Sequence, residues 1–277
     1  MFFHCDKPVG VFDSGIGGIS VLAEMLRILP QERYIYLADS ANAPYGTKSV
    51  DEVRSLSMNA AQFLLEKGAK CIVVACNTAT SAAVGVMRSV LNVPIVGMEP
   101  AVKPAVEMHR PGAVLVMATP LTLKEEKFRA LASRFSESAE IVPVPCPGLV
   151  ELIESGCVEG PRIQEYLEDK LGPLRKKPVA AVVLGCTHYV FIEREVARFM
   201  GNDVPVVHGN VGTARQLKAV LEREGLLCSH DETVPNPAGF EETVTFYATA
   251  DFEKTVSLCK TFLKRTQASA AVLSQSR

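Results

Sequence analysis

Tryptophan is absent from the 277 residues, aromatic residues make up only 6%, and no extended basic block or long hydrophobic run occurs. The longest apolar segments, such as residues 71–76 and 179–185, fall far short of the roughly 20 residues of a membrane helix. Residues 1–10 lack the apolar stretch of a secretory signal. With a net charge of −2, the electrostatic footprint of a nucleic-acid-binding protein is also missing. These absences predict a cytoplasmic protein that binds neither membranes nor nucleic acid.

The usual cysteine spacings of zinc and redox sites are lacking too. None of the eight cysteines forms a Cys-x-x-Cys pair, so we predict no metal and no cofactor. In a reducing compartment the cysteines should be thiols, most of them buried. Hydrophobic residues (48%) and charged residues (22%) are balanced as in an ordinary globular protein of about two domains.

Short apolar segments alternate with helical periodicity along most of the chain. Strands are expected at residues 8–13, 34–38, 71–75, 93–97, 112–117, 140–144, 179–184, 204–207 and 243–248. Helices are expected at residues 18–29, 50–67, 163–171, 213–224 and 252–264, and also after the segments 76–80, 118–122, 146–148 and 185–189. The tail from residue 266 is expected to fray. This alternation predicts parallel sheets with helices on both faces.

An internal repeat organises these elements. Cys76 and Cys186 each follow an apolar strand and lie 110 positions apart, and Val-Pro-Ile-Val around Pro94 matches Val-Pro-Val-Val around Pro205 at nearly the same offset. Two independent landmarks with one offset indicate a duplicated unit. We therefore predict an α/β fold of two pseudo-symmetric doubly wound domains, residues 1–98 plus 209–277 and residues 99–208. The active site should lie in the cleft between them.

Polar side chains gather where the predicted strands end, which is where parallel sheets bind ligands. These residues are Asp13, Ser14, Cys76, Asn77, Thr78, Thr119, Cys186, Thr187 and His188.

Each cysteine taken alone is better explained as a buried core residue. Asn77 or Thr78 is expected to cap the helix after Cys76, and Thr187 the helix after Cys186. A Cys186–His188 pair also fits a nucleophile and its base, whereas zinc is less favoured because the ligand set is incomplete. One thiol from each repeat, on opposite faces of a carbon atom, suits removal and return of its proton with inversion.

Three further residues are candidates, and Asp13 has two possible roles. The glycine-rich turn at residues 15–18 lacks the Lys-Ser/Thr of a phosphate loop, so it reads as a tight strand-to-helix connection. Asp13 before it would hold a substrate ammonium or assist the nearby thiol. Tyr45 and Gly46 either pack or bind a carboxylate, and Glu154 is either a solvated helix residue or an auxiliary acid.

These residues form recognisable motifs. They are Asp13-Ser14-Gly15-x-Gly17-Gly18, Leu37-Ala38-Asp39 with Pro44-Tyr45-Gly46, Ala75-Cys76-Asn77-Thr78-Ala79-Thr80 and Gly185-Cys186-Thr187-His188-Tyr189. With them the chain resembles bacterial glutamate racemases, of the aspartate/glutamate racemase family, along nearly its whole length. Val190 departs from the proline usual there, and His208-Gly209 and Glu125 replace residues that are usually serine or aspartate.

The resemblance implies cofactor-independent interconversion of L- and D-glutamate, which is an isomerase reaction. It implies that the D-glutamate is used in peptidoglycan synthesis, and thus in cell-wall biogenesis and the maintenance of cell shape. It implies Cys76 as the base for D-glutamate and Cys186 as the base for L-glutamate, assisted by Asp13, His188 and Glu154. It also implies a homodimer. The substrate contacts that it implies are Asp13, Ser14, Tyr45, Gly46, Asn77, Thr78, Thr119, Thr187 and His188.

Two alternatives stay open at this point. A racemase of the same fold could act on aspartate or a similar acid. A two-lobed amino-acid-binding protein with structural cysteines would bind its ligand without exchanging the Cα proton.

Overall fold

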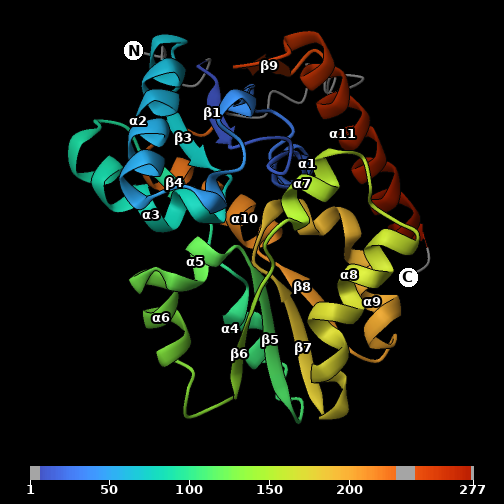
Figure 1. Ribbon diagram of the computed structural model, residues 1–277. Coiled ribbons are helices and arrows are strands. Elements are labelled where there is room, and N and C mark those ends of the chain that lie inside the picture. Colours follow the sequence, from blue (N-terminus) through green and yellow to red (C-terminus); the bar gives the residue numbers. More distant parts are fainter. Residues whose placement is uncertain (1–6, 229–240, 276–277) are drawn as a thin grey trace.

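The computed structural model describes residues 7–228 and 241–275, which form two parallel β-sheets covered by helices (Figure 1). The first sheet has the strand order β4-β3-β1-β2-β9 and the second β6-β5-β7-β8. The strands of the first sheet are β1 (Val9–Asp13), β2 (Tyr34–Ala38), β3 (Cys71–Val74), β4 (Ile95–Gly97) and β9 (Val244–Ala248). Those of the second are β5 (Ala113–Ala118), β6 (Ile141–Pro145), β7 (Val179–Leu184) and β8 (Val206–His208). The predicted α/β fold class is confirmed.

Helices lie on both faces of each sheet (Figure 1). The helices of the first sheet are α1 (Ile19–Ile28), α2 (Val50–Glu66), α3 (Asn77–Val90), α10 (Asn210–Arg223) and α11 (Phe252–Gln275). The chain of the second sheet carries α4 (Val102–Val106), α5 (Pro120–Lys124), α6 (Glu126–Ser133), α7 (Leu149–Glu154), α8 (Pro161–Leu171) and α9 (Glu193–Met200). Short 3₁₀ helices are η1 (Ser40–Asn42), η2 (Tyr45–Thr47), η3 (Gly172–Lys176) and η4 (Thr187–Ile192). No helix in the described ranges is long and apolar enough to cross a membrane.

The strand order repeats as the sequence duplication predicts. The order β4-β3-β1-β2 of the first sheet recurs as β8-β7-β5-β6 in the second. Strands β3 and β7 occupy the same place in the two copies, and each leads into one of the two repeat cysteines. Strand β9 then extends the first sheet beyond β2, while α10 and α11 pack against α1. The chain therefore returns to its first sheet, although the exact limits of the two domains stay a prediction.

Local sequence signals set the ends of α2, the helix that borders the cavity described below. Ser49 accepts a hydrogen bond from the backbone N–H of Glu52, whose carboxylate accepts one from the backbone N–H of Ser49. This capping box satisfies two backbone donors that a helix start leaves free. At the other end, Gly68 has a φ of +85°, which a residue without a side chain adopts at little cost. The predicted helix at residues 50–67 is thus confirmed.

Two predicted helices and the predicted tail differ from the structure. The helix expected after residues 118–122 begins earlier, at Pro120, and is broken into α5 and α6, because Glu125 has an extended backbone at the end of one helix and the start of the next. After Cys186 the chain first forms the 3₁₀ helix η4, and α9 begins only at Glu193. The tail predicted to fray from residue 266 is helical through Gln275 in α11.

Candidate active site

The carboxyl ends of the central strands bring polar residues of both halves together. Asp13 ends β1, and its carboxylate Oδ2 accepts a hydrogen bond from the Thr187 hydroxyl at 3.1 Å, which links the first sheet to the loop after β7. The hydroxyls of Thr78, at the start of α3, and Thr119, after β5, lie 2.9 Å apart. All of these side chains are buried. The predicted strand-end residues therefore share one interior site between the two sheets.

Cys76 begins α3 and is its N-cap. Its backbone is extended (φ −138°, ψ 121°), and its Sγ accepts the backbone N–H of Ala79 at 3.5 Å. The expectation that Asn77 or Thr78 caps this helix is therefore wrong, since both already have helical positions in α3. The thiol is only 6% exposed. Because a helix N-terminus carries partial positive charge, it favours negative charge on this sulfur during a reaction.

A short hydrogen-bonded chain connects Cys76 to Asp13. The Cys76 thiol donates to the Ser14 Oγ at 3.9 Å, and the Ser14 hydroxyl donates to the Asp13 Oδ1 at 3.1 Å. Asp13 thus reaches the thiol through Ser14 in the described contacts. Burial raises the pKa of Cys76 well above its usual range, and the charges of Asp13 and Cys186 raise that pKa further. Cys76 is therefore held as a neutral thiol.

Cys186 has different neighbours. Its Sγ lies 3.9 Å from Nδ1 of His188, whose Nε2 lies 2.9 Å from Oε1 of Glu154 on α7. Burial lowers the pKa of His188, but hydrogen bonds to Cys186 and Glu154 and the charge of Asp13 outweigh it, so the pKa lies well above its usual range. Burial has the opposite effect on Glu154 and raises its pKa, but the hydrogen bond and charge of His188 bring that pKa below its usual range. The ring is therefore an imidazolium between a carboxylate and a sulfur.

Thr187 does not have the capping role expected from the sequence. Cys186 is the N-cap residue of η4 and makes no capping bond with its side chain. The Thr187 hydroxyl donates instead to Asp13. Because the chain forms a 3₁₀ helix here, its first turn is tighter than an α-helix, and Thr187 is turned toward the first sheet.

The glycine-rich turn after Asp13 lies against the second half. A side chain on Gly17 would overlap the ring of His188 and the hydroxyl of Thr187, and one on Gly15 would overlap the carboxylate of Glu154. Only residues without a Cβ let the turn approach this closely. The turn thus serves as the tight connection predicted from the sequence, and it packs the first half against the side chains beside Cys186.

Three buried threonine hydroxyls form a cluster at the other side of the site. The Oγ1 atoms of Thr78, Thr119 and Thr122 lie 2.9–3.1 Å from one another. A Cβ on Gly46 would lie only 2.8 Å from that of Thr119, so the turn containing Gly46 presses on the cluster. Sequence reasoning missed Thr122 as a site residue. The signal was its spacing from Thr119, because a residue three positions after an N-cap lies beside the capping side chain.

The side chain of Asn77 has no hydrogen-bond partner in the described structure, whereas that of Tyr45 has one. Both polar atoms of the Asn77 amide are buried without a partner in the described structure, and the residue is only 3% exposed. An unpaired buried amide is costly, which points to a ligand group as its partner. The Tyr45 hydroxyl is already committed, because it donates to Oδ2 of Asp39 at 2.6 Å. Asp39 was missed from the sequence, although it follows β2 as Asp13 ends β1.

This arrangement places a neutral thiol and a sulfur paired with an imidazolium in one buried site. A thiol can give a proton and a thiolate can take one, so a pair of cysteines in one site fits proton exchange at an acidic carbon. Within the described ranges, no three His, Cys, Asp or Glu side chains are grouped so that they could hold a metal ion.

Comparisons with known proteins agree with this class of chemistry. The sequence profile of the family described as Asp/Glu/Hydantoin racemase matches residues 9–217. A glutamate racemase of Clostridium acetobutylicum is 53% identical over 80% of this chain and 87% of its own length. The crystal structure of the Francisella tularensis glutamate racemase in complex with D-glutamate matches at a TM-score of 0.78, with 30% identity and 94% of each chain covered. The Escherichia coli glutamate racemase, in complex with L-glutamate and the activator UDP-MurNAc-ala, matches at 0.72, with 33% identity over 78% of this chain and 83% of that one.

The fold and the relatives define an isomerase of the two-sheet α/β class. The chain belongs to the Asp/Glu/Hydantoin racemase family. The resemblance drawn from the sequence motifs is thereby confirmed.

Proposed function

We propose that this protein is a cofactor-independent racemase that interconverts L- and D-glutamate by proton transfer between Cys76 and Cys186. The observation that carries the proposal is that two thiols with different surroundings lie in one site, Cys76 linked through Ser14 to Asp13 and Cys186 beside His188. Cys76 is a buried neutral thiol, whereas the imidazolium of His188 stabilises negative charge on Cys186. A base on one side and an acid on the other are what inversion at a carbon requires.

In the direction from L- to D-glutamate, the reaction begins with Cys186 as the thiolate and Cys76 as the thiol. The Cys186 thiolate takes the Cα proton, the electron pair stays on the substrate as a carbanion, and the Cys76 thiol gives its proton to the opposite face. The products are D-glutamate, a Cys186 thiol and a Cys76 thiolate. The Ala79 N–H and the start of α3 stabilise that new thiolate, and the reverse steps convert D-glutamate.

The substrate must also be held and its carbanion stabilised, because the α-proton of an amino acid is weakly acidic. We assign the unpaired amide of Asn77 and the threonine cluster to the substrate carboxylates, since both present hydrogen-bond donors in a buried site. Asp13 and Ser14 act on the Cys76 side, and Gly46 contributes its backbone N–H. The Tyr45 hydroxyl is bound to Asp39, so we assign Tyr45 to positioning this turn.

Glutamate is favoured over aspartate because the relatives that match most of the chain at 53% and 30% identity are glutamate racemases. On the same basis we propose that the protein supplies D-glutamate to peptidoglycan synthesis in the cytoplasm and acts as a homodimer. We also propose residues 1–98 plus 209–277 and residues 99–208 as its two domains. A binding protein without catalysis is disfavoured, because structural cysteines need no imidazolium.

The experiment that tests this function follows the conversion of one enantiomer into the other by circular dichroism. The substrates are L- and D-glutamate and L- and D-aspartate, each in heavy water. We expect racemisation of glutamate, with solvent deuterium at Cα of the enantiomer formed. Faster turnover of aspartate would show that aspartate, and not glutamate, is the substrate. Tight binding of glutamate with neither racemisation nor exchange would show a binding protein and contradict the proposed enzyme.

A further inference from the structure

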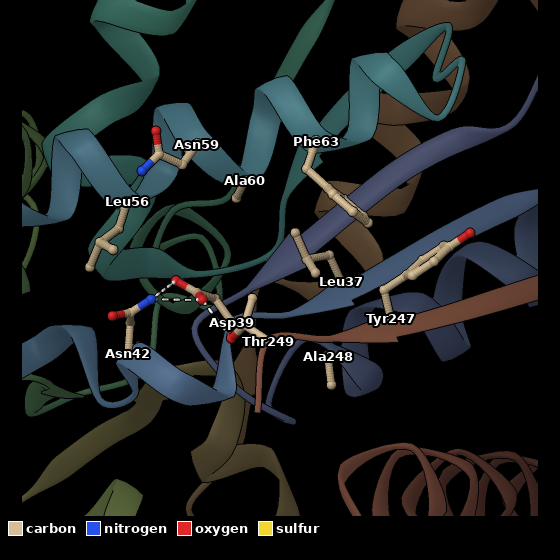
Figure 2. A pocket seen from close by; sticks show the side chains of 10 residues that line it. All are labelled: Leu37, Asp39, Asn42, Leu56, Asn59, Ala60, Phe63, Tyr247, Ala248 and Thr249. Atoms are coloured by element: carbon tan, nitrogen blue, oxygen red, sulfur yellow. Dashed lines mark hydrogen bonds between the residues drawn. The ribbon is translucent and has the colours of Figure 1, made fainter. Parts of the chain in front are cut away.

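A second hollow lies between α2 and the edge formed by β2 and β9 (Figure 2). It has a volume of about 270 Å³. Its lining contains neither repeat cysteine nor any hydroxyl of the threonine cluster. The lining residues are Leu37, Asp39, Asn42, Leu56, Asn59, Ala60, Phe63, Tyr247, Ala248 and Thr249.

One end of this cavity is apolar and aromatic. Phe63 and Tyr247 meet edge to face, with ring centroids 5.1 Å apart, and Leu37 lies beside them, whereas Leu56 lies toward Asn42 (Figure 2). An apolar protein cavity of about 150 Å³ is large enough to bind benzene. The volume therefore accommodates one aromatic ring and a short polar arm.

The other end holds a buried carboxylate that lacks a cation. Asp39 is 4% exposed, and its oxygens accept hydrogen bonds from Asn42 and Thr249 (Figure 2). They accept a third from the hydroxyl of Tyr45, and all three donors are neutral. No Lys, Arg or His of the described ranges forms an ion pair with it. Because a buried charge is normally compensated by an opposite charge, the group that this end selects is a cation.

We propose that this cavity binds a small arylalkyl ammonium compound, with its ring against Phe63 and Tyr247 and its ammonium at Asp39. The orientation follows from Lys67, whose Nζ lies 5.3 Å from the centroids of both rings. That cation repels a second ammonium at the aromatic end, so the charge of the ligand is directed to Asp39. The side chain of Asn42, only half-buried, is the donor that the ammonium displaces.

The cavity is linked to the site of racemisation through Asp39. Its backbone N–H donates to the carbonyl of Asp13 at 2.9 Å, and its carboxylate holds the hydroxyl of Tyr45, next to Gly46. An ammonium that competes for this carboxylate loosens the turn that presses on Thr119. We therefore expect the ligand to raise the KM for glutamate more than it lowers kcat. This effect rests on the proposed function, whereas binding does not.

Calorimetric titration of the full chain with three probes tests the site. Phenethylamine has the ring and the charge, 2-phenylethanol has the ring alone, and n-butylamine has the charge alone. We expect phenethylamine to bind at least about tenfold tighter than either of the others. Equal affinity of phenethylamine and 2-phenylethanol, or the absence of saturable phenethylamine binding, would overturn the proposal.

A variant pair locates the binding. Ala60→Leu fills the cavity from α2, and Gln62→Leu adds the same side chain at an exposed position of that helix. Phenethylamine binding should be lost in the first and kept in the second, and unchanged binding in Ala60→Leu places the ligand elsewhere and contradicts the proposal. The three-probe comparison on the unaltered protein decides the question even if Ala60→Leu fails to fold. The same comparison tests binding independently of the proposed function, because it needs no racemisation of glutamate.

Discussion

Replacing Glu154 by glutamine removes the charge that keeps the ring of His188 protonated while preserving the shape of the side chain. The carboxylate lies 2.9 Å from Nε2 of the ring, and the side chains of His188 and Glu154 are 2% and 29% exposed. The pair is therefore largely shielded from water. Without the carboxylate the pKa of His188 falls, and the imidazolium that stabilises negative charge on Cys186 is lost in part.

The size of the effect follows from this geometry. A hydrogen bond to a charged group contributes about 1.5–3 kcal/mol, which corresponds to a loss of about 10- to 160-fold in kcat/KM. The loss must be equal for L- and D-glutamate, because free enantiomers have the same free energy and the ratio of the two kcat/KM values equals the equilibrium constant. The individual kcat values are free to change by different factors.

The assay measures kcat/KM in both directions by circular dichroism and follows the ring protons of His188 by NMR over pH. Glu151→Gln is the matched control, because Glu151 lies on the same helix but is exposed. We expect that control to behave as the parent protein. A Glu154→Gln variant with unchanged kcat/KM and an unchanged titration of His188 would refute the role given to this carboxylate.

Three further outcomes are expected. The pKa of His188 is raised and that of Glu154 is lowered in the folded state, so their pair stabilises the fold between those two pKa values. The loss of stability in Glu154→Gln should therefore shrink below the lower pKa and above the higher one in urea unfolding over pH, and a pH-independent loss would contradict this. Asn77→Ala should raise the KM for glutamate while leaving the unfolding free energy unchanged or higher by about 1 kcal/mol, since a buried unpaired amide is removed; a clear loss of stability would argue against that. Lys70→Met leaves the fully buried carboxylate of Glu32 without its ion-pair partner, so the unfolding free energy should fall by about 3–5 kcal/mol, and a fall below about 1 kcal/mol would show that Glu32 needs no cation.

The sequence was sufficient for the fold and for the general position of the site. Strands such as those ending at Asp13 and preceding Cys76 are short, continuous apolar runs, which parallel strands buried on both faces require. The duplication then determined the repeated strand order, because two copies of one pattern fold alike. Polar residues at the ends of those strands were predictable because parallel strands present the same end to a common edge.

Details that depend on backbone conformation were not predictable. The sulfur of Cys76 caps α3 because residue 76 is extended, and cysteine is not among the residues preferred at that position. The extended backbone at Glu125 and the 3₁₀ turn at Thr187 are likewise local conformations that hydrophobic periodicity does not specify. Asp39 and Thr122 were missed because their importance lies in contacts to Tyr45 and Thr119, and those contacts appear only once the turns are placed.

Enantiomer-specific exchange in single-cysteine variants tests the central claim most directly. Cys76→Ser and Cys186→Ser are incubated in heavy water with each enantiomer of glutamate, and deuterium at Cα is measured by mass spectrometry, with Cys157→Ser, a thiol remote from both bases in the described contacts, as control. Neither variant should racemise. Cys76→Ser should exchange only L-glutamate and Cys186→Ser only D-glutamate, because each keeps a base on one face. Racemisation at the parent rate in either variant, or exchange of both enantiomers by one of them, would contradict a mechanism that needs one thiol on each side.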